Sequence, residues 1–503
     1  LQERYADLPV EESSAYAVIV GGGAGGLLAA YKLAKEGKTP LLLEKGPSCA
    51  SSNLANLSGP AACNTSNQKA SGITIATERA LYDHYVEWAR GSANTKLLKN
   101  LLSNSTEAFE SLVDCGLHFY NYVEYTGDPQ YGESLKWAPL HNFVEVGEER
   151  IQPIVNAIEA MGGSFIYNCE ATEVVLEDGV VAGVKAIRDN NTVLSIATKA
   201  VFLATGGFGA SEEMIHDRFL GVPLVNMGTP TNSGDGIRMA EAAGAVCENY
   251  YGLISNEICG ANQKHGSAMY DADWNLNNEN LCFAIYGGLM VDETGERFMN
   301  EDQCYPMSYA AGANQPKHYS WIVWDGNYWD DIAQFDTCGC SRLYPAPSGT
   351  AFNADVYDCE AMSKEHLDEF WLNPRLEAGT LKKADTLEAL ADMMEFDADQ
   401  KATFLATVER YNGLVAAGED TDFGKPAYRL SDVETAPFYA ARIGGELLVT
   451  THGVITDVNS RPLKNDGTPI EGLYVCGNDQ GGFYPHNYPS CLLYTSPSPR
   501  DGL

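Results

Sequence analysis

Residues 16–27 read YAVIVGGGAGGL, and this stretch determines the fold class that the sequence predicts. It begins with a short apolar run, β-branched in its second half, which is typical of a strand buried in a parallel sheet. A glycine-rich turn follows at once, and residues 27–35 have the pattern of a helix. Residues 39–44 predict the next buried strand. The sequence therefore predicts a complete β–α–β unit near the start of the chain.

The glycine-rich turn has the spacing G-x-G-x-x-G, in which each glycine has its own task. Gly21 permits the tight turn, Gly23 lets the backbone approach a pyrophosphate, and Gly26 lets helix and strand pack closely. The unpaired N–H groups at the helix N-terminus then face the phosphates. Glu44 ends the second strand, where a carboxylate can accept hydrogen bonds from ribose hydroxyls. This unit alone does not distinguish NAD from FAD.

Three later glycine-containing segments favour FAD. Residues 204–209 (ATGGFG) end a predicted strand, residues 234–236 (GDG) open a predicted helix, and residues 472–477 (GLYVCG) end a strand near the C-terminus. An extended dinucleotide needs contacts from several strand ends along one sheet edge, whereas a single phosphate site needs only one.

Local patterns give expectations for the first half of the chain. Residues 1–14 are polar and acidic and are predicted to be a frayed lead-in. Residues 165–196 predict four strands, with Asp178-Gly179 and Asn190-Asn191 as turns.

A separate region is expected in the second half. From about residue 250 to residue 434 the β–α alternation fades, with helices near 363–370 and 385–413. The α/β character returns at residues 445–454.

Composition excludes several classes of protein. The 503 residues contain 33 Lys and Arg against 68 Asp and Glu, a net charge of −35, which argues against nucleic acid or an anionic membrane as the main partner. No apolar run approaches the ~20 residues of a membrane span. The 13 cysteines are too sparse for a disulfide scaffold and include no C-x-x-C, and Cys338-Gly339-Cys340 favours a loop with free thiols over an iron–sulfur site. No metal site is expected.

In combination, these motifs resemble the FAD-dependent fumarate reductase and 3-ketosteroid dehydrogenase flavoproteins. The matching pieces occur in family order and are VIVGGGAGG (18–26), LLEK (42–45), SN (52–53), SG (58–59), ATGGF (204–208), GDG (234–236), GERFMNE (295–301) and GLYVCG (472–477). The resemblance implies a doubly wound, Rossmann-like α/β domain that binds FAD non-covalently and is interrupted by an α+β capping domain. The substrate would lie between the cap and the flavin ring.

The resemblance also implies domain boundaries and cofactor contacts. The FAD-binding domain would comprise residues 1–250 and 441–490, and the capping domain residues 251–440. Residues 491–503 change composition abruptly, resemble translated sequencing-adapter read-through and are expected to be a non-native tail. The expected cofactor-binding residues are Gly21, Gly23, Ala24, Gly25, Gly26, Glu44, Lys45, Ser52, Asn53, Ser58, Gly59, Ala171 (with Thr172 beside the adenine), Thr205, Gly206, Gly207, Asp235, Gly477 and Asn478.

The chain departs from the fumarate-type pattern at two arginine positions. Fumarate-type members carry an arginine proton donor after R-F-x-N-E and a second arginine that clamps a substrate carboxylate. By count along this chain, those positions are Tyr305 and Tyr488, and Thr450-Thr451-His452-Gly453 stands where the family has His-Thr before a glycine pair. Without guanidinium pairing, the desolvation of a dicarboxylate is uncompensated. Tyrosine at both positions resembles the ketosteroid-dehydrogenase branch.

The resemblance implies catalytic roles for these tyrosines. Tyr305 would exchange a proton on one carbon while flavin N5 exchanges a hydride with its neighbour, and Tyr488 would hydrogen-bond the conjugated carbonyl. A helper could come from the loop at 119–137, which contains Tyr120, Tyr122, Tyr125 and Tyr131. Packing or substrate lining is the alternative role for both tyrosines, and structural roles are expected for Glu301, His452 and His486.

The predicted function is hydride transfer between flavin N5 and a carbon–carbon bond conjugated to a carbonyl, in a neutral, bulky substrate. One alternative is a fumarate-reductase-like reductase of an unsaturated acid, with arginines such as Arg342 or Arg375. The other is a non-catalytic flavin electron carrier. The expected partners are a small-molecule substrate and an external electron donor or acceptor protein, for which the acidic composition would suit a basic surface. The protein is expected to be soluble, either cytoplasmic or exported with its signal removed.

Overall fold

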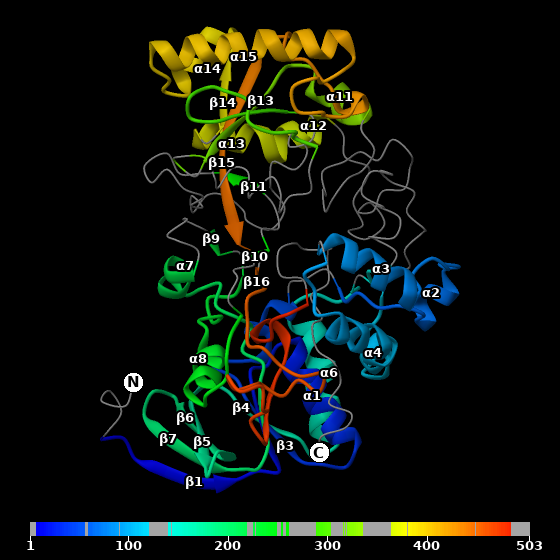
Figure 1. Ribbon diagram of the computed structural model, residues 1–503, viewed down its shortest axis with the longest axis vertical. Coiled ribbons are helices and arrows are strands. Elements are labelled where there is room, and N and C mark those ends of the chain that lie inside the picture. Colours follow the sequence, from blue (N-terminus) through cyan, green and yellow to red (C-terminus); the bar gives the residue numbers. More distant parts are fainter. Residues whose placement is uncertain are drawn as a thin grey trace.

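A computed structural model describes most of the chain. The described residues are 7–55, 59–89, 91–119, 139–141, 143–218, 225–226, 228–248, 253–254, 258–260, 288–302, 315, 317, 319–334, 364–379, 381–447 and 449–483. Figure 1 shows two bodies along the long axis of the molecule, a sheet-and-helix body below and a smaller helix-covered sheet above.

The lower body is built on a five-stranded parallel sheet. The strand order is β17-β8-β2-β3-β4, and every neighbouring pair is parallel. Its strands are β2 (Ala17–Val20), β3 (Pro40–Leu43), β4 (Ser164–Ile166), β8 (Val201–Leu203) and β17 (Leu473–Val475). Helix α1 (Ala24–Lys35) links β2 to β3, which confirms the predicted β–α–β unit and the α/β fold class.

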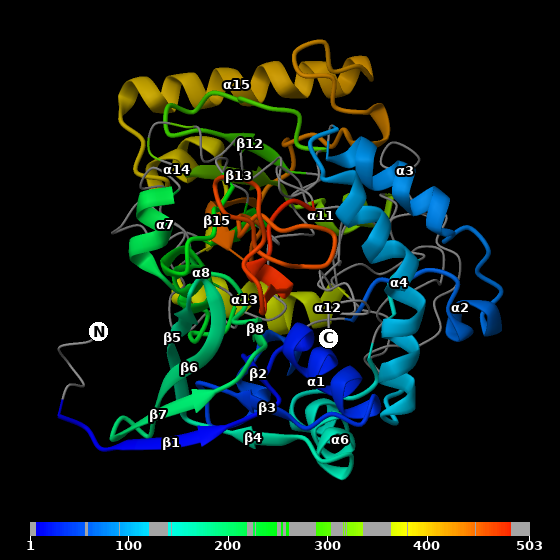
Figure 2. The same ribbon diagram turned by 60° about the horizontal axis from the view of Figure 1, so that its bottom comes forward.

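Both faces of this sheet are covered, which explains the continuous apolar runs of its strands. Ala17 and Ile19 pack with α1 and α6 (Glu148–Ala160), whereas the alternate residues Val18 and Val20 pack with the strands and helix of the opposite layer. That layer contains β5 (Cys169–Glu177), β6 (Val180–Arg188), β7 (Thr192–Ala197) and α8 (Asp235–Ala242). Figure 2 shows the β5–β7 sheet and α6 beside the parallel strands.

The turns of the β5–β6–β7 meander test the sequence prediction directly. Asp178 and Gly179 both have positive φ, 52° and 81°, which matches the predicted tight turn. The second turn lies one residue earlier than predicted, because Asp189 and Asn190, not Asn191, adopt the left-handed conformation. Short polar side chains such as Asp and Asn tolerate this conformation.

The prediction of a frayed lead-in is wrong for residues 10–14. These residues form β1 (Val10–Ser14), which pairs in parallel with β7, with Val10 opposite Val193 and Ser14 opposite Ala197. All five side chains are exposed, so β1 has no apolar alternation that could reveal it. It is held by backbone pairing at the sheet edge.

The upper body is a mixed sheet covered by helices. Its strands are β9 (Val225–Asn226), β11 (Ile258–Gly260), β12 (Leu289–Val291), β13 (Ser320–Trp324), β14 (Leu381–Ala384) and β15 (Phe438–Leu447). Its helices are α11 (Tyr328–Gln334), α12 (Lys364–Leu367), a π-helical turn (Asp368–Leu372), α13 (Asn373–Ala378), α14 (Leu387–Met393) and α15 (Ala398–Ala417). Trp321, Phe404 and Tyr411 are fully buried in its core.

The helix expected at 385–413 is two helices. Glu395 has φ +62°, which ends α14, and Asp397 caps the N-terminus of α15. The Asp397 side chain accepts hydrogen bonds from the backbone N–H groups of Asp399 and Gln400, and the Gln400 side chain accepts one from the Asp397 N–H. This capping box favours a fresh helix start over continuation.

Strand β15 runs from the upper body toward the lower one (Figure 1). It pairs with β13 and β14 over residues 438–443 and with β9 at residues 446–447. Beyond it, β16 (Val449–Thr450) pairs with β10 (Leu253–Ile254). The predicted domain boundary at 440/441 lies inside this strand and remains a prediction.

The remaining helices flank the lower body. They are α2 (Ser66–Ala70), α3 (Glu78–Trp88), α4 (Thr95–Asp114) and α7 (Glu212–Arg218). Residues of α3 and α4 share an apolar cluster with Val449 and Phe483, so they pack against the C-terminal segment. Among the helices of the described ranges, none is both long and apolar enough to cross a membrane.

Candidate dinucleotide-binding site

A cavity that is open to solvent lies at the carboxyl ends of the parallel strands. This is where open α/β sheets bind ligands. The structure brings together most of the predicted cofactor-binding residues in its lining. Those residues are Gly21, Gly23, Ala24, Gly25, Glu44, Lys45, Ser52, Asn53, Ala171, Thr205, Gly206, Asp235, Gly477 and Asn478.

The glycine-rich turn leaves the start of α1 open toward the cavity. Gly23 is the N-cap of α1 and supplies no side-chain cap to its first N–H groups, which suits them to an anionic ligand. Gly21 has φ +105°, and a Cβ on Gly26 would collide with the Gly21 carbonyl oxygen. Both glycines therefore have the tasks that the sequence predicts for them.

Glu44 connects the glycine-rich turn to the end of β3. Its Oε2 accepts a hydrogen bond from Gly22 N–H at 2.7 Å and its Oε1 one from Gly46 N–H at 2.6 Å. Burial raises the pKa of this carboxyl, although these N–H groups and Lys45 oppose the shift. Each carboxylate oxygen can accept a second hydrogen bond, so Glu44 keeps acceptor capacity toward the cavity.

Lys45 joins three elements at the cavity. Its Nζ lies 2.9 Å from Ser233 Oγ, 2.9 Å from Asp235 Oδ2 and 3.3 Å from Glu170 Oε1. Burial disfavours the charge on Lys45, but Asp235 and Glu170 outweigh it and raise the pKa of the amine. The cluster holds the end of β3 against the start of α8 and the start of β5.

Asp479 is a buried residue that the sequence analysis missed. Its carboxylate accepts hydrogen bonds from Thr205 N–H at 2.6 Å and Gly207 N–H at 2.8 Å, and from the Thr205 hydroxyl. Thr205 Oγ1 in turn accepts from Gly236 N–H at 2.9 Å. Complete burial raises the pKa of Asp479 to about 6. This side chain joins the loops after β8 and β17, and an acidic residue directly after Gly477-Asn478 was the available sequence signal.

Two polar segments complete the lining. Asn53 Oδ1 accepts from Thr229 N–H at 2.7 Å, which connects the segment after β3 to the segment before α8. Thr231 and Asn232 also line the cavity and were not predicted. They lie directly before the G-D-G motif, which was the signal that could have identified them.

Other predicted cofactor residues lie elsewhere. Three predicted glycines lie outside the cavity lining. Gly26 packs against Gly21, and a Cβ on Gly207 would meet the Thr450 hydroxyl. Gly59 is buried. Thr172 also lies outside the lining, and its hydroxyl donates to the Lys185 carbonyl oxygen. The residues that fall outside the described ranges are Ser58, Tyr305, Tyr488, His486, Arg342 and the loop tyrosines Tyr120, Tyr122, Tyr125 and Tyr131.

Two of the three polar residues expected to be structural, His452 and Glu301, occupy buried, bonded positions. His452 Nε2 lies 2.7 Å from the Glu248 carbonyl oxygen, and Arg218 Nη1 lies 3.1 Å from His452 Nδ1. Burial lowers the pKa of His452. Glu301 is fully buried beside Arg297 in the upper body. Within the described ranges, no group of three or more His, Cys, Asp or Glu side chains could hold a metal ion.

The cavity fits an extended dinucleotide. An uncapped helix N-terminus faces it, Gly23 leaves space where a side chain would project, and its lining extends from Ala171 on β5 to Gly477 after β17. Contacts from several strand ends are what FAD requires. The fold and the site thus define a dinucleotide-binding flavoprotein.

The family comparison agrees with this class. Residues 17–491 match the FAD binding domain family, so the chain belongs to that family and its cofactor is FAD.

Three curated relatives are similar to the chain. Vinyl phenol reductase of Lactiplantibacillus plantarum is 28% identical over 96% of this chain and 94% of its own length. NADH:fumarate oxidoreductase of Klebsiella pneumoniae is 26% identical over 93% of this chain but 45% of its own length. 3-Oxosteroid 1-dehydrogenase of Mycolicibacterium smegmatis is 29% identical, covering 69% of this chain and 59% of its own. The chain thus spans about half the length of two of these relatives.

A solved structure shows the same fold. The 3-ketosteroid Δ1-dehydrogenase from Sterolibacterium denitrificans superposes with a TM-score of 0.69 at 19% identity, covering 97% of each chain. Its likeness confirms the fold expected from the sequence.

Proposed function

We propose that the protein is an FAD-dependent oxidoreductase that acts on a carbon–carbon bond conjugated to a carbonyl, in a neutral, bulky substrate. The proposal rests on an FAD cavity combined with Tyr305 and Tyr488, which by count along the family motifs stand where the resemblance places the arginines of fumarate-type members. When bound, FAD supplies hydride exchange at N5. Tyr305 exchanges the proton, and Tyr488 donates a hydrogen bond to the conjugated carbonyl.

Two arginines of the described residues support a neutral substrate. The Arg297 guanidinium is 5% exposed and is bonded to both Glu301 and Asp420. Arg218 bonds to Glu241 and contacts His452. To bind either guanidinium, a substrate carboxylate would have to displace the side chains that the arginine already contacts. Arg375, the alternative named from the sequence, is buried on α13 in the upper body.

The names of the relatives support the same class of reaction. The relative that this chain covers nearly end to end is a vinyl phenol reductase, and another is a 3-oxosteroid dehydrogenase. Vinyl phenols and oxosteroids are uncharged or weakly acidic molecules. An external electron donor or acceptor protein remains part of the proposal, and the net charge of −35 suits a partner with a basic surface.

Kinetics of Tyr305→Phe and Tyr488→Phe test the assigned roles. Turnover of a neutral steroid enone per bound FAD is expected to fall about 100-fold or more for Tyr305→Phe, since general acid–base catalysis contributes about 10²–10⁴-fold. The Tyr488→Phe variant is expected to lose about 100-fold, the order of one oxyanion-type hydrogen bond. Turnover that stays within about twofold in both variants would contradict the proposal.

A further inference from the structure

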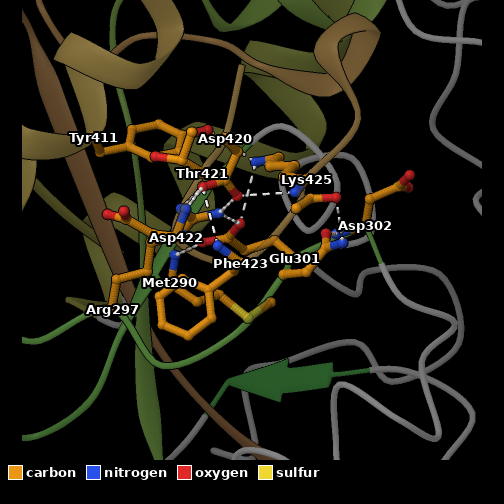
Figure 3. Close-up of polar contacts among 12 residues, drawn as sticks. Met290, Arg297, Glu301, Asp302, Tyr411, Asp420, Thr421, Asp422, Phe423 and Lys425 are labelled. Atoms are coloured by element: carbon orange, nitrogen blue, oxygen red, sulfur yellow. Dashed lines mark hydrogen bonds and ion pairs between the residues drawn. The ribbon is translucent and has the colours of Figure 1, made fainter.

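A buried network of four charged side chains lies in the upper body (Figure 3). It joins residues 288–301 to Tyr411 on α15 and to the loop after that helix. We call it the cap ion network, and its members are Arg297, Glu301, Asp420 and Lys425. Two are positive and two negative, and each is at most 5% exposed at its side chain. Asp302 forms its own buried ion pair with Arg429.

Arg297 is the centre of the network. Its Nε and Nη2 donate to Glu301 at 2.9 and 2.8 Å, and its Nη1 and Nη2 donate to Asp420 at 3.0 and 2.8 Å. The guanidinium thus makes two paired contacts with two carboxylates, a geometry that fixes orientation as well as charge. Its carbon lies 4.9 Å from the ring centre of Tyr411 and 5.0 Å from that of Phe423.

Lys425 completes the other side of Glu301. Its Nζ lies 3.5 Å from Glu301 Oε2, donates to the Tyr411 hydroxyl at 2.9 Å and reaches the Gly288 carbonyl oxygen at 3.3 Å. Glu301 Oε1 also accepts from Met290 N–H at 3.2 Å. Burial alone would raise the pKa of Glu301, but Lys425 and Arg297 hold it below its usual value.

The loop that contains Asp420 and Lys425 is also held in place by hydrogen bonds. Asp420 accepts backbone hydrogen bonds from Asp422, Phe423 and Lys425, so its carboxylate shapes the loop that presents Lys425. Asn300 donates to the Gly424 carbonyl oxygen at 3.1 Å. The side chains of Arg297 and Asn300 are therefore both bonded to the loop that contains Asp420 and Gly424.

Stability alone is a weak reason for such an arrangement. Replacing buried ion pairs by apolar residues of similar volume is often neutral or stabilising. The network does, however, fix the segment that ends three residues before Tyr305 in the sequence. A displacement of about 1 Å at a reacting group can cost about 100-fold in rate.

We propose that the cap ion network is a positioning device for catalysis, in which Arg297, Glu301 and Lys425 hold residues 297–302, the segment that precedes Tyr305 in the sequence. This inference rests on the proposed function. Arg297 is the positioning residue whose forked geometry matters most, because only a planar guanidinium can hold two carboxylates in register.

The decisive variant is Arg297→Lys, which keeps the positive charge and removes the fork. The matched control is Arg410→Lys on α15. Arg410 makes a fork with Asp422 at 3.0 and 2.6 Å but is 59% exposed and lies outside the network. Two readouts are needed: kcat and KM for a neutral steroid enone per bound FAD, and amide hydrogen exchange over residues 297–302.

We expect Arg297→Lys to lower kcat about 100-fold with KM changed less than threefold, and to speed exchange in that segment at least tenfold. Arg410→Lys should change each quantity less than twofold. If Arg297→Lys does not fold, Tyr411→Phe, which removes one partner of Lys425, is expected to change both readouts in the same direction by a smaller factor.

Unchanged amide hydrogen exchange over residues 297–302 in Arg297→Lys would overturn the proposal. Faster exchange with unchanged kcat in that variant would also overturn it. A uniform rise in KM with unchanged kcat would also overturn it. If the wild-type protein turns over no neutral substrate, the proposed function fails, and the exchange comparison alone then decides whether Arg297 fixes the segment.

Discussion

The dinucleotide cavity and the cap ion network are built from different kinds of chemical group. Around the cavity, glycines and backbone N–H groups leave space and unpaired donors, and Glu44 and Asp479 bind mainly to backbone N–H groups. In the network, carboxylates and cations satisfy one another with no space between them. The first arrangement can receive a ligand, whereas the second can only hold the chain in place.

The same contrast appears in the titration of the carboxyl groups. Burial raises the pKa of Glu44 and Asp479, because neutral N–H groups compensate only part of the lost hydration. In the network, the pKa values of Glu301 and Asp420 are lowered despite burial, because Arg297 and its neighbours bear full positive charges. This comparison leads to the following predictions, from the largest expected effect to the smallest.

The largest expected effect is on stability in the network. Arg297→Met leaves Glu301 and Asp420 without their main partner, and removing one partner of a buried ion pair costs about 3–5 kcal/mol. Arg410→Met at the exposed pair is expected to cost about 0–1 kcal/mol. Urea unfolding of both variants measures the difference. Equal costs would show that the buried and exposed forks do not differ.

The second prediction concerns pH. The native pKa of Asp479 is raised from 3.8 to about 6, so the folded state binds its proton more tightly than the unfolded state. Its contribution is therefore complete below pH 4 and is lost as pH rises toward 6, by up to about 3 kcal/mol. The stability advantage of wild type over Asp479→Asn should shrink across this window.

Asp420 should show the opposite trend. Its native pKa lies below the unfolded value, so its contribution is present above pH 4 and is lost as pH falls through the acid range. The advantage of wild type over Asp420→Asn should therefore grow with rising pH. Unfolding free energies of the three proteins between pH 3 and 7 give both trends, and parallel trends would refute the contrast.

The third prediction concerns the space in the cavity. A Cβ on Gly23 would meet only the Ser52 Cβ, at 3.8 Å, and φ at Gly23 is −79°, so Gly23→Ala fits the protein itself. We expect a stability change within about 0.5 kcal/mol without FAD. FAD affinity should fall about tenfold or more, about 1.4 kcal/mol, because the methyl group fills space at the helix N-terminus. Unchanged affinity would place FAD elsewhere.

The sequence predicted the cofactor frame well because its signals are local. The turn at Gly21–Gly26, the strands beside it and Glu44 lie within one β–α–β unit. Strand β1 was missed because its five exposed residues carry no apolar pattern. Asp479 was missed because its partners lie 272 and 274 residues away.

The cap ion network also depends on partners that are far apart in the sequence. A structural role for Glu301 was expected and agrees with its buried contacts, but Asp420 lies 123 residues from Arg297, a pairing that no local pattern indicates. Tyr305 and Tyr488 rest on position within family motifs and remain predictions.

Anaerobic reoxidation of the reduced, FAD-loaded protein tests the central claim most directly. Neutral vinyl phenols, steroid enones, fumarate and acrylate are each mixed with the reduced protein, and the return of the oxidised flavin absorbance is followed. The account predicts that a neutral steroid enone reoxidises the flavin at least tenfold faster than fumarate or acrylate. Faster reoxidation by fumarate or acrylate, or none by any compound, would contradict it.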